Sequence, residues 1–312
     1  MSSYSLTKPM PRFQKTLRKI AARWQLYLLL VPPIVFIFIF SYMPMYGVQI
    51  AFRQYNMRLG IWNSPWVGLR WFRMFFDSPV FSRIMVNTIR ISLYSLAASI
   101  IPPVIIAIAI NEARNKVFSK SVQLITYMPH FLSVVVVTSI IHQLFSLSGL
   151  VNNVISSLGF DTIQFLGRPG MFPHIFVWSE VWQHSGFNAI IFIAALSGIN
   201  PELHEAATID GANIWQRIRH IDIPSLLPTV VILLILRSAN ILGVGFERVF
   251  LLQNPLNMST SDVIATYVFR MGLHNMEFGL ASAVGLFQSV ISLMMILIVN
   301  TISRRLTESS LW

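Results

Sequence analysis

The stretch "HEAATIDGANIWQRIRHIDIPSLLP", residues 204–228, is polar and helix-prone in a chain that consists mostly of long apolar runs. Just before it, Pro201 and Glu202 are typical of a helix start, because proline suits the first helical position and carboxylates favour the positive end of the helix dipole. Gly211 interrupts this helix, since glycine accepts the backbone conformations that end one. We therefore expect a short helix that ends at a glycine corner and is too polar to enter lipid.

A second helical run, residues 212–221, follows the glycine. Its apolar side chains recur at spacings of four and three residues, so they share one face. They are Ile214, Ile218 and Ile221. Pro224 and Pro228 are expected to stop the run before the next apolar segment. From the residues alone, an ordinary loop helix packed on the membrane surface is as good an interpretation as any functional role.

The composition indicates an integral membrane protein. Of the 312 residues, 54% are hydrophobic and only 11% are charged, and the mean hydropathy is +0.64. The net charge is +11, but Lys and Arg flank apolar runs and form no basic patch interleaved with stacking aromatics, which argues against nucleic-acid binding. The absence of cysteine excludes disulfides, cysteine-zinc sites and iron–sulfur clusters.

Six apolar runs are long enough to cross a bilayer, which takes about 20 residues because backbone groups in lipid must bond to one another. They lie near residues 24–50, 87–110, 122–145, 172–197, 226–246 and 280–302. We therefore predict an all-α integral membrane fold with a six-helix transmembrane domain, residues 24–302.

Basic residues set the expected orientation. A cluster of them precedes the first apolar run, within an amphipathic segment at residues 1–23, and the positive-inside rule places that segment in the cytoplasm. With six spans, the tail at residues 303–312 is then cytoplasmic too, so both termini are inside. Segment 201–225, between the fourth and fifth spans, lies on the same side. The first outer loop, residues 53–83, mixes Trp, Phe and Arg as an interfacial helix does.

Polar side chains inside the predicted spans mark a candidate path for a solute, because they are costly in lipid and tend to face a cavity or a neighbouring helix. On the fourth span, three of them are spaced four residues apart, beside two tryptophans whose ring planes suit the apolar faces of sugar rings. The alternative is that Glu180 and Arg237 form an internal ion pair and that the tryptophans are packing or interface anchors. The candidate path residues are Trp178, Glu180, Trp182, His184, Asn188, Arg237, Asn240 and Gln288.

No catalytic, metal or nucleotide site is expected on this chain. A phosphate-binding P-loop ends in Gly-Lys, and none of the lysines here follows a glycine. His204-Glu205 begins like the zinc motif HExxH, but Thr208 occupies the position of the second histidine. His130 and His142 are treated as lone histidines of the third span, each expected to hydrogen-bond a neighbouring helix and to bind no metal.

Two other classes of membrane protein are possible for a chain with a candidate solute path and no nucleotide site. An ion-coupled secondary transporter of a polar solute is the main alternative, but such proteins often show internal repeats and a relay of membrane carboxylates. Only Glu180 lies clearly at membrane depth, and the two halves of the chain show no convincing repeat. A membrane-embedded enzyme would need paired carboxylates, a nucleophile with its base or a metal set, and the sequence contains none of these.

The opening stretch resembles the cytoplasmic EAA signature of ATP-binding-cassette (ABC) importer permeases: EAA, three residues and a glycine, then nine residues and I-x-L-P. The chain departs from it only at Ile223, which replaces the leucine. Other stretches, such as "WVGLRWFRMFFDSPVFSRIMVNT" (66–88) and "SRRLTESSLW" (303–312), are similar to the MalF-like, binding-protein-dependent carbohydrate permeases, above all those of LplB type. The residues that carry the signature and its expected coupling role are Glu205, Ala206, Ala207, Asp210, Gly211, Ile218, Ile221 and Pro224.

The resemblance implies type I importer architecture and a non-catalytic permease subunit in a bacterial cytoplasmic (inner) membrane. It also implies partners: a second homologous permease in a heterodimer, a dimeric cytoplasmic ATPase that holds ATP and Mg²⁺, an extracytoplasmic solute-binding protein and a carbohydrate substrate. Segment 201–225 would be the coupling segment that docks in a cleft of the ATPase. Glu205 would be its anionic anchor and Gly211 its corner, with Pro224 stiffening the join to the fifth helix.

Charge bears on the identity of the substrate. The outer segments carry more basic than acidic residues, and Arg90 and Arg237 add positive charge near or within the path. A positive entrance would concentrate an anionic ligand, so we hypothesise an acidic oligosaccharide such as an alginate- or pectin-derived oligouronate. If these arginines instead pair internally or hold lipid phosphates, the substrate is a neutral oligosaccharide.

Overall fold

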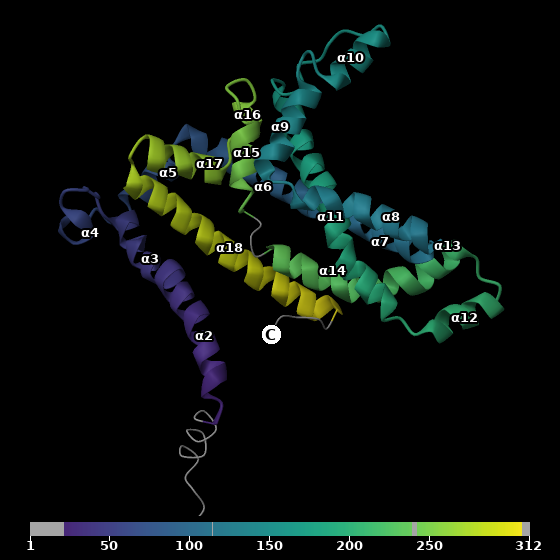
Figure 1. The fold of residues 1–312 in the computed structure, drawn as a ribbon. Helices are drawn as coiled ribbons and strands as arrows, with labels where there is room; N and C mark the ends of the chain where they lie inside the picture. Colours follow the sequence, from purple (N-terminus) through teal and green to yellow (C-terminus); the bar gives the residue numbers. More distant parts are fainter. Residues whose placement is uncertain (1–21, 114, 239–241, 308–312) are drawn as a thin grey trace, which may run out of the picture.

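The computed structural model describes residues 22–113, 115–238 and 242–307, and these form helices joined by loops (Figure 1). Within those ranges the only strand-like pairings are two isolated bridges. The predicted all-α fold is confirmed. Three predictions fall wholly or partly outside the described residues: the amphipathic segment 1–23, the end of the tail 303–312, and Asn240 as a path residue.

Five helical stretches of the described chain are long and apolar enough to cross a membrane. A sixth is counted if the bent pair Pro169–Ser197 and Pro201–Ile209 is one span. The five are Trp24–Phe52, Pro79–Glu112, Val134–Ser157, Ile214–Ser238 and Phe278–Ile302. If the bent pair is counted, the number agrees with the predicted six spans, although several boundaries differ.

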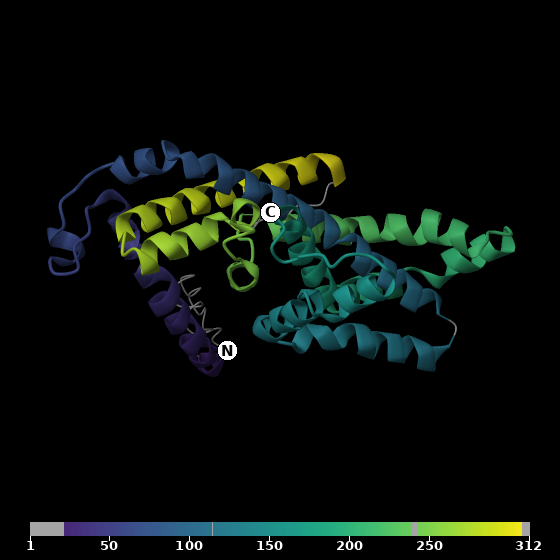
Figure 2. The same ribbon diagram turned by 90° about the horizontal axis from the view of Figure 1, so that it is seen from above.

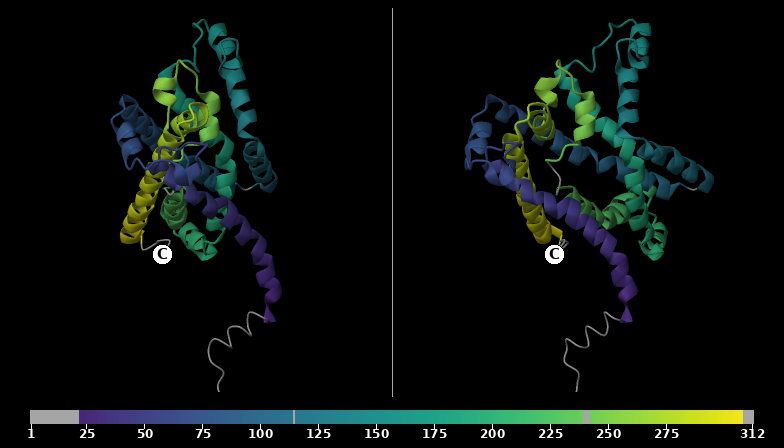
Figure 3. Two further views of the ribbon diagram at one scale, coloured as in Figure 1. Left: turned by 90° about the vertical axis from the view of Figure 1, so that its left-hand side faces the viewer. Right: turned by 60° about the vertical axis from the view of Figure 1, so that its left-hand side comes forward.

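The first span stands apart from the other helices. It begins with α2 (Trp24–Ile37), continues through η1 (Phe38–Tyr42) and α3 (Met43–Met45), and contacts α18 (Phe278–Thr307) only near its end, through η2 (Tyr46–Phe52). No residue of α2 is buried, and Figure 3 shows this helix extending away from the rest of the molecule. Its apolar side chains therefore face surroundings other than the helices of this chain.

Helix α11 (Phe172–Ser197) is central and has the bounds predicted for the fourth span. It packs against α6 (Pro79–Ala98), α7 (Ile101–Glu112) and α14 (Ile223–Ser238). Small residues at these contacts let the helix axes approach closely. The buried side chains between α7, α11 and α14 are Ala107, Ala189, Phe192, Leu196 and Leu226.

The predicted third span, residues 122–145, is broken into two helices. α8 (Lys116–Tyr127) ends at the 3₁₀ turn η3 (Met128–Phe131), and α9 (Val134–Phe145) begins after it. The prediction of one continuous helix here is wrong. Pro129 explains the break, because proline lacks an amide hydrogen and restricts the residue before it.

The polar segment after α11 forms α12 (Pro201–Ile209), which is bent by 72° from the preceding helix. The side chain of Asn200 caps α12 by accepting a hydrogen bond from the amide of Glu202 at 3.1 Å, and Pro201 occupies the first turn. Figure 2 shows α12 and its neighbours at one extremity of the molecule. The predicted start and end of this helix are confirmed.

The helix that follows does not stop at the prolines. α13 (Ile214–Arg217) passes through a π-turn, η5 (Ile218–Asp222), directly into α14, which contains Pro224 and Pro228. The prediction that these prolines end the run is wrong. A π-turn adds a residue ahead of the first proline, and membrane helices tolerate proline where neighbouring groups satisfy the freed carbonyls. The fifth span is therefore continuous with segment 201–225 and does not begin near residue 226.

Short helices gather at the opposite end of α11. A buried carboxylate joins α17 (Ile264–Phe269) and η6 (Arg270–His274): Asp262 is fully buried and accepts hydrogen bonds from the Thr266 hydroxyl at 3.1 Å and from the Arg270 guanidinium at 3.1 and 2.8 Å. On α6, Asn87 donates to the backbone oxygen of Asp262 at 3.0 Å. The predicted interfacial loop contributes one of these helices, whose Phe75 is buried. They are α5 (Arg70–Phe76), α10 (Leu150–Ser157), α15 (Phe246–Leu252), α16 (Met258–Ser261), α17 and η6.

Candidate functional site

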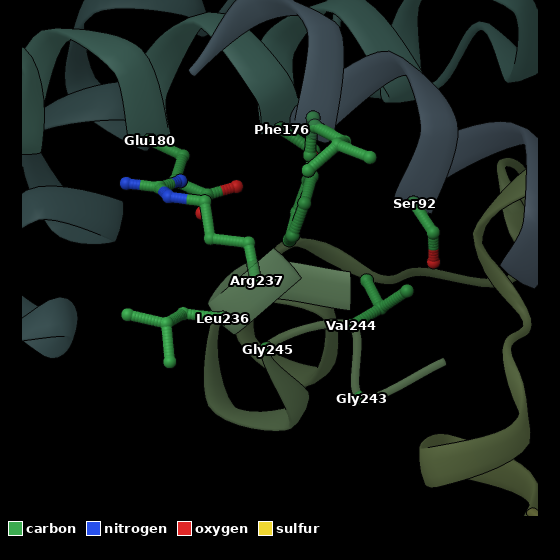
Figure 4. A pocket seen from close by; sticks show the side chains of 10 residues that line it. Ser92, Phe176, Glu180, Leu236, Arg237, Gly243, Val244 and Gly245 are labelled. Atoms are coloured by element: carbon green, nitrogen blue, oxygen red, sulfur yellow. The ribbon is translucent and has the colours of Figure 1, made fainter. Parts of the chain in front are cut away.

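Two adjoining cavities lie between α6, α11 and α14. The larger has a volume of about 350 Å³ and the smaller about 100 Å³, and Ser95, Glu180 and Arg237 line both. Figure 4 shows Glu180 and Arg237 together at one side of the larger cavity, with Ser92 on the other side. Helices α11 and α14 thus bring Glu180 and Arg237, the two charged residues of the predicted path, to one place.

The smaller cavity holds the rest of the predicted polar stripe of α11. His184 and Asn188 line it together with Glu180, as their spacing of four residues favours. The ion pairs that the described residues form within 4.0 Å do not include one between Glu180 and Arg237. The two charged side chains therefore face one cavity without forming an ion pair with each other.

Three serine hydroxyls in these walls lack a partner. The Oγ atoms of Ser92, Ser95 and Ser185 are buried and make no hydrogen bond within the described part of the chain. A buried hydroxyl left unpaired costs about 1–3 kcal/mol, so such groups are ordinarily satisfied by water or by a polar ligand. Sequence reasoning did not find these residues, because serine in an apolar helix is a weak signal.

Arg248 is a further charged residue of this region. Only 4% of it is exposed, although it lies outside the predicted spans. Its guanidinium donates to the Ser179 hydroxyl at 2.9 Å and to the side-chain oxygen of Gln183, whose amide donates to the Leu132 carbonyl at 2.8 Å. Burial lowers the pKa of Arg248, and the charge of Glu180 raises it. Arg248 therefore holds α15 against α11 and adds positive charge beside the cavity.

The two predicted tryptophans lie elsewhere. Trp178 and Trp182 line a separate, mainly apolar cavity of about 450 Å³ between α9 and α11. The Trp178 indole donates to the Tyr94 hydroxyl at 2.8 Å, and that hydroxyl is 3.0 Å from the His174 Nδ1. The structure does not bring these rings together with Glu180. Gln288 lines neither polar cavity and donates to the Leu242 carbonyl at 3.1 Å.

His130, expected to be isolated, is paired with His184, a residue of the predicted path on α11. The Nδ1 atoms of His130 and His184 lie 3.0 Å apart, and the His130 ring stacks on Phe187. His130 therefore contacts a neighbouring helix, as predicted, but the expectation that it is a lone histidine is wrong. His142 does contact a neighbouring helix, through the Leu251 carbonyl at 3.0 Å. Within the described residues, no group of three potential metal ligands is present.

The corner between α12 and α13 is a Schellman motif. Gly211 has φ +79°, the amide of Ala212 donates to the Ala207 carbonyl at 2.9 Å, and the amide of Gly211 donates to the Thr208 carbonyl at 3.1 Å. A capping box then starts α13, with Asn213 and Gln216 bonding each other's amides at 3.0 and 2.7 Å. These local bonds give the segment a defined shape without burying it.

The signature residues divide between the two faces of this segment. Glu205, Ala206, Asp210 and Gly211 are exposed, whereas Ala207, Ile218 and Ile221 are partly buried. Pro224 is exposed. The isoleucines thus pack against the chain, and other apolar side chains form the free surface: Leu203, Ile209 (86% exposed) and Trp215 (78% exposed). Large apolar groups in a segment too polar for lipid are the sequence signal that could have identified this surface.

The chain is similar to known proteins along most of its length. The family model for "Binding-protein-dependent transport system inner membrane component" matches residues 99–308. Protein LplB of Bacillus subtilis is 38% identical over 291 residues, 93% of this chain and 91% of the relative. The polygalacturonan/rhamnogalacturonan transport system permease protein YteP of the same organism is 34% identical over 300 residues, 96% of this chain and 94% of the relative.

Solved structures show the same similarity. A chain in the crystal structure of a bacterial ABC transporter involved in import of the acidic polysaccharide alginate is 40% identical, with a TM-score of 0.87. A chain of the alginate ABC transporter in complex with its alginate pentasaccharide-bound periplasmic protein is 39% identical, with a TM-score of 0.86. Each similarity covers 94% of this chain and 99% of the solved one.

Proposed function

The chain belongs to the family of binding-protein-dependent transport system inner membrane components, and from that membership we propose that it is one of two permease subunits through which an ABC importer carries acidic oligosaccharides. The observation that carries this proposal is similarity along nearly the whole chain to a permease of a polysaccharide importer, at 40% identity. The membership itself makes the chain a sugar ABC importer permease with an all-helical membrane fold.

The proposed assembly has three kinds of partner in a bacterial cytoplasmic membrane. A second homologous permease completes the path, an extracytoplasmic protein delivers the solute, and a dimeric ATPase on the cytoplasmic side binds ATP and Mg²⁺. The alginate transporter solved with its periplasmic protein supports the delivery partner. Both termini of this chain and segment 201–225 then lie in the cytoplasm, as the basic cluster before the first span favours.

We further propose that the coupling segment docks on the ATPase. Glu205 is exposed and forms no ion pair among the described residues, so its carboxylate is free to meet a basic group of the ATPase. Ile209 and Trp215 supply an apolar surface beside it. Ala206 and Asp210 are exposed on the same short helix and its end, and the Gly211 corner sets the angle to the fifth span.

The proposed path includes the polar cavities. Glu180, His184, Asn188 and Arg237 supply hydrogen-bonding and charged groups to their walls. An acidic substrate is supported by Arg237, by the excess of basic residues in the outer segments, and by the relatives whose names specify polygalacturonan and alginate. Trp178, Trp182 and Gln288 lie outside these cavities and are proposed as lining only where the second permease or a different state exposes them.

Reconstitution tests the proposed function. The chain, a homologous permease and the ATPase in proteoliposomes should take up oligouronate only with ATP and the binding protein, and the purified chain alone should hydrolyse no ATP. Uptake that persists without ATP but follows a proton or sodium gradient would instead identify an ion-coupled secondary transporter. Hydrolysis by the chain alone would contradict a permease role.

A further inference from the structure

A buried carboxylate lies where the coupling segment joins the fifth span. Asp222, in the π-turn η5, is fully buried, and neither of its carboxylate oxygens has a hydrogen-bond partner within the described residues. A buried charge without compensation is strongly unfavourable, so a group placed next to such a carboxylate matters for the whole element. The signature asks for no particular residue at this position, and the sequence offered no role for Asp222.

A titratable group close to this carboxylate comes from the other side of the glycine corner. The Nε2 atom of His204, on α12, is 3.3 Å from the Oδ1 atom of Asp222. The side chain of His204 is only 26% exposed, whereas the neighbouring Glu205 is an exposed residue. The same short helix thus presents Glu205 outward and His204 inward, toward the start of the fifth span.

A second contact spans the same corner. The Arg217 guanidinium, on α13, donates to the Thr208 hydroxyl of α12 at 3.1 Å and lies 3.6 Å from the carboxylate of Glu112 at the end of α7. Glu112 and Arg217 also act electrostatically on Asp222. Four charged or titratable side chains from α7, α12, α13 and η5 therefore form one polar cluster behind the coupling segment.

Little else holds α12 in place. None of its residues is buried, so apolar packing contributes little to its orientation. Its connection to the fifth span is a single corner at Gly211, whose bonds define the local turn only. Polar side-chain contacts across the corner are therefore what can join α12 to the helix beyond it.

We propose that His204 and Asp222 are a positioning pair that holds α12 and the start of the fifth span as one rigid body during transport. This inference rests on the proposed docking of α12 on the ATPase. A rigid join makes any displacement of α12 a displacement of α14, which carries Arg237 in the cavity wall. Without the pair, α12 would still dock, but its movement would be lost at the glycine corner.

The test compares His204→Gln, Asp222→Asn and the double variant in the reconstituted importer, measuring uptake and ATP hydrolysis together. The ATPase should stay bound, while substrate transported per ATP falls at least about fivefold, the lower end of ordinary coupling effects. The double variant should be no worse than the worse single one, because both remove the same contact. His220→Gln is the matched control: His220 is exposed, its one hydrogen bond within the described residues is with the Gln216 carbonyl at 2.9 Å, and the variant should couple normally.

A cross-link provides a readout that simple structural damage would not give. The chain has no cysteine, so His204→Cys with Asp222→Cys can be joined selectively by a short bis-methanethiosulfonate, with the other subunits made cysteine-free. The reagent should restore coupling that the two substitutions remove. If joining the pair stops uptake, the pair must separate during the cycle and the rigid-body proposal is wrong. Should Asp222→Asn fail to assemble, the partly exposed His204→Gln decides the question alone.

A wrong docking function and a wrong positioning role for His204 and Asp222 would give different results. If the ATPase does not bind the wild-type chain with its partner permease, the proposed docking function is wrong. If the ATPase binds wild type and variants alike and the ratio of uptake to hydrolysis is unchanged in His204→Gln and Asp222→Asn, only the positioning role is wrong.

Discussion

Gly211 has φ +79°, and a Cβ built there would meet no atom within 4 Å. Strain in a substituted residue would therefore come from the backbone alone. Gly211→Val should cost about 1–2 kcal/mol in this left-handed conformation, because a β-branched residue tolerates it poorly. We expect this variant to insert in the membrane but to lose ATPase retention or coupling, measured by co-purification and uptake.

Gly211→Asn is the matched control, since asparagine accepts the left-handed region more readily than other side chains and often replaces glycine at this helix position. It should retain most of the wild-type uptake. Equal uptake by the Val and Asn variants would show that the corner conformation has no part in coupling.

Glu205 offers a second test at the scale of one side chain. Because the carboxylate is exposed and forms no ion pair among the described residues, Glu205→Ala should leave the thermal unfolding midpoint of the purified chain unchanged. It should nevertheless weaken ATPase retention at least about fivefold, as removal of one partner of an interfacial charge pair does.

Glu202→Gln is the comparison for that experiment. Glu202 is also exposed on α12, but its carboxylate accepts a hydrogen bond from the side-chain amide of Asn200 at 3.1 Å. Retention should be close to wild type in this variant. A loss as large as that of Glu205→Ala would indicate a general dependence on negative charge at this helix and would refute a specific anchor at Glu205.

At the scale of helices, the approach of α8 to α11 depends on Gly186. A Cβ at this position would overlap the backbone carbonyl of Thr126, which belongs to α8. Backbone cannot move aside as a flexible side chain can, so Gly186→Ala should force the two helices apart and destabilise the protein by about 1–3 kcal/mol. The thermal unfolding midpoint in detergent should fall accordingly.

Gly285, in α18, is the control for this prediction because a Cβ there would meet nothing within 4 Å. Gly285→Ala should be neutral or stabilise by up to about 1 kcal/mol, the helix propensity difference between the two residues. If both variants unfold at the same temperature, the close contact between α8 and α11 carries no stability.

For the whole molecule, the charge of the path predicts which substrates stimulate ATP hydrolysis. Acidic oligosaccharides should stimulate the reconstituted complex more than neutral ones of equal length, and Arg237→Gln should reduce that preference, because Arg237 lines both polar cavities. Arg90→Gln changes the net charge equally outside these cavities, since Arg90 is exposed and lines neither, and should have a smaller effect.

If neutral oligosaccharides alone stimulate hydrolysis and Arg237→Gln leaves that response unchanged, Arg237 serves to balance the nearby Glu180, and the substrate is neutral.

Local features of the chain were predictable from the sequence. The lengths of the apolar runs indicated the membrane class, and the bounds of α11 followed from one such run. Pro201 and Gly211 marked the limits of α12, because capping and corner conformations depend on residues adjacent in the chain. The EAA signature indicated the family for the same reason, as a fixed spacing along one segment.

Tertiary structure decided which side chains meet. Trp178 and Glu180 lie two residues apart on α11, so their side chains differ by about 200° in direction and point to different sides of the helix. The packing of α11 determined that Glu180 lines the polar cavities and Trp178 the apolar one. Arg248 became buried through the packing of α15 on α11, and Asp222 met His204 through the corner at Gly211 and the π-turn η5, which set the relative rotation of these helices. Such rotations depend on contacts between segments far apart in the chain, and a local sequence pattern carries no information about them.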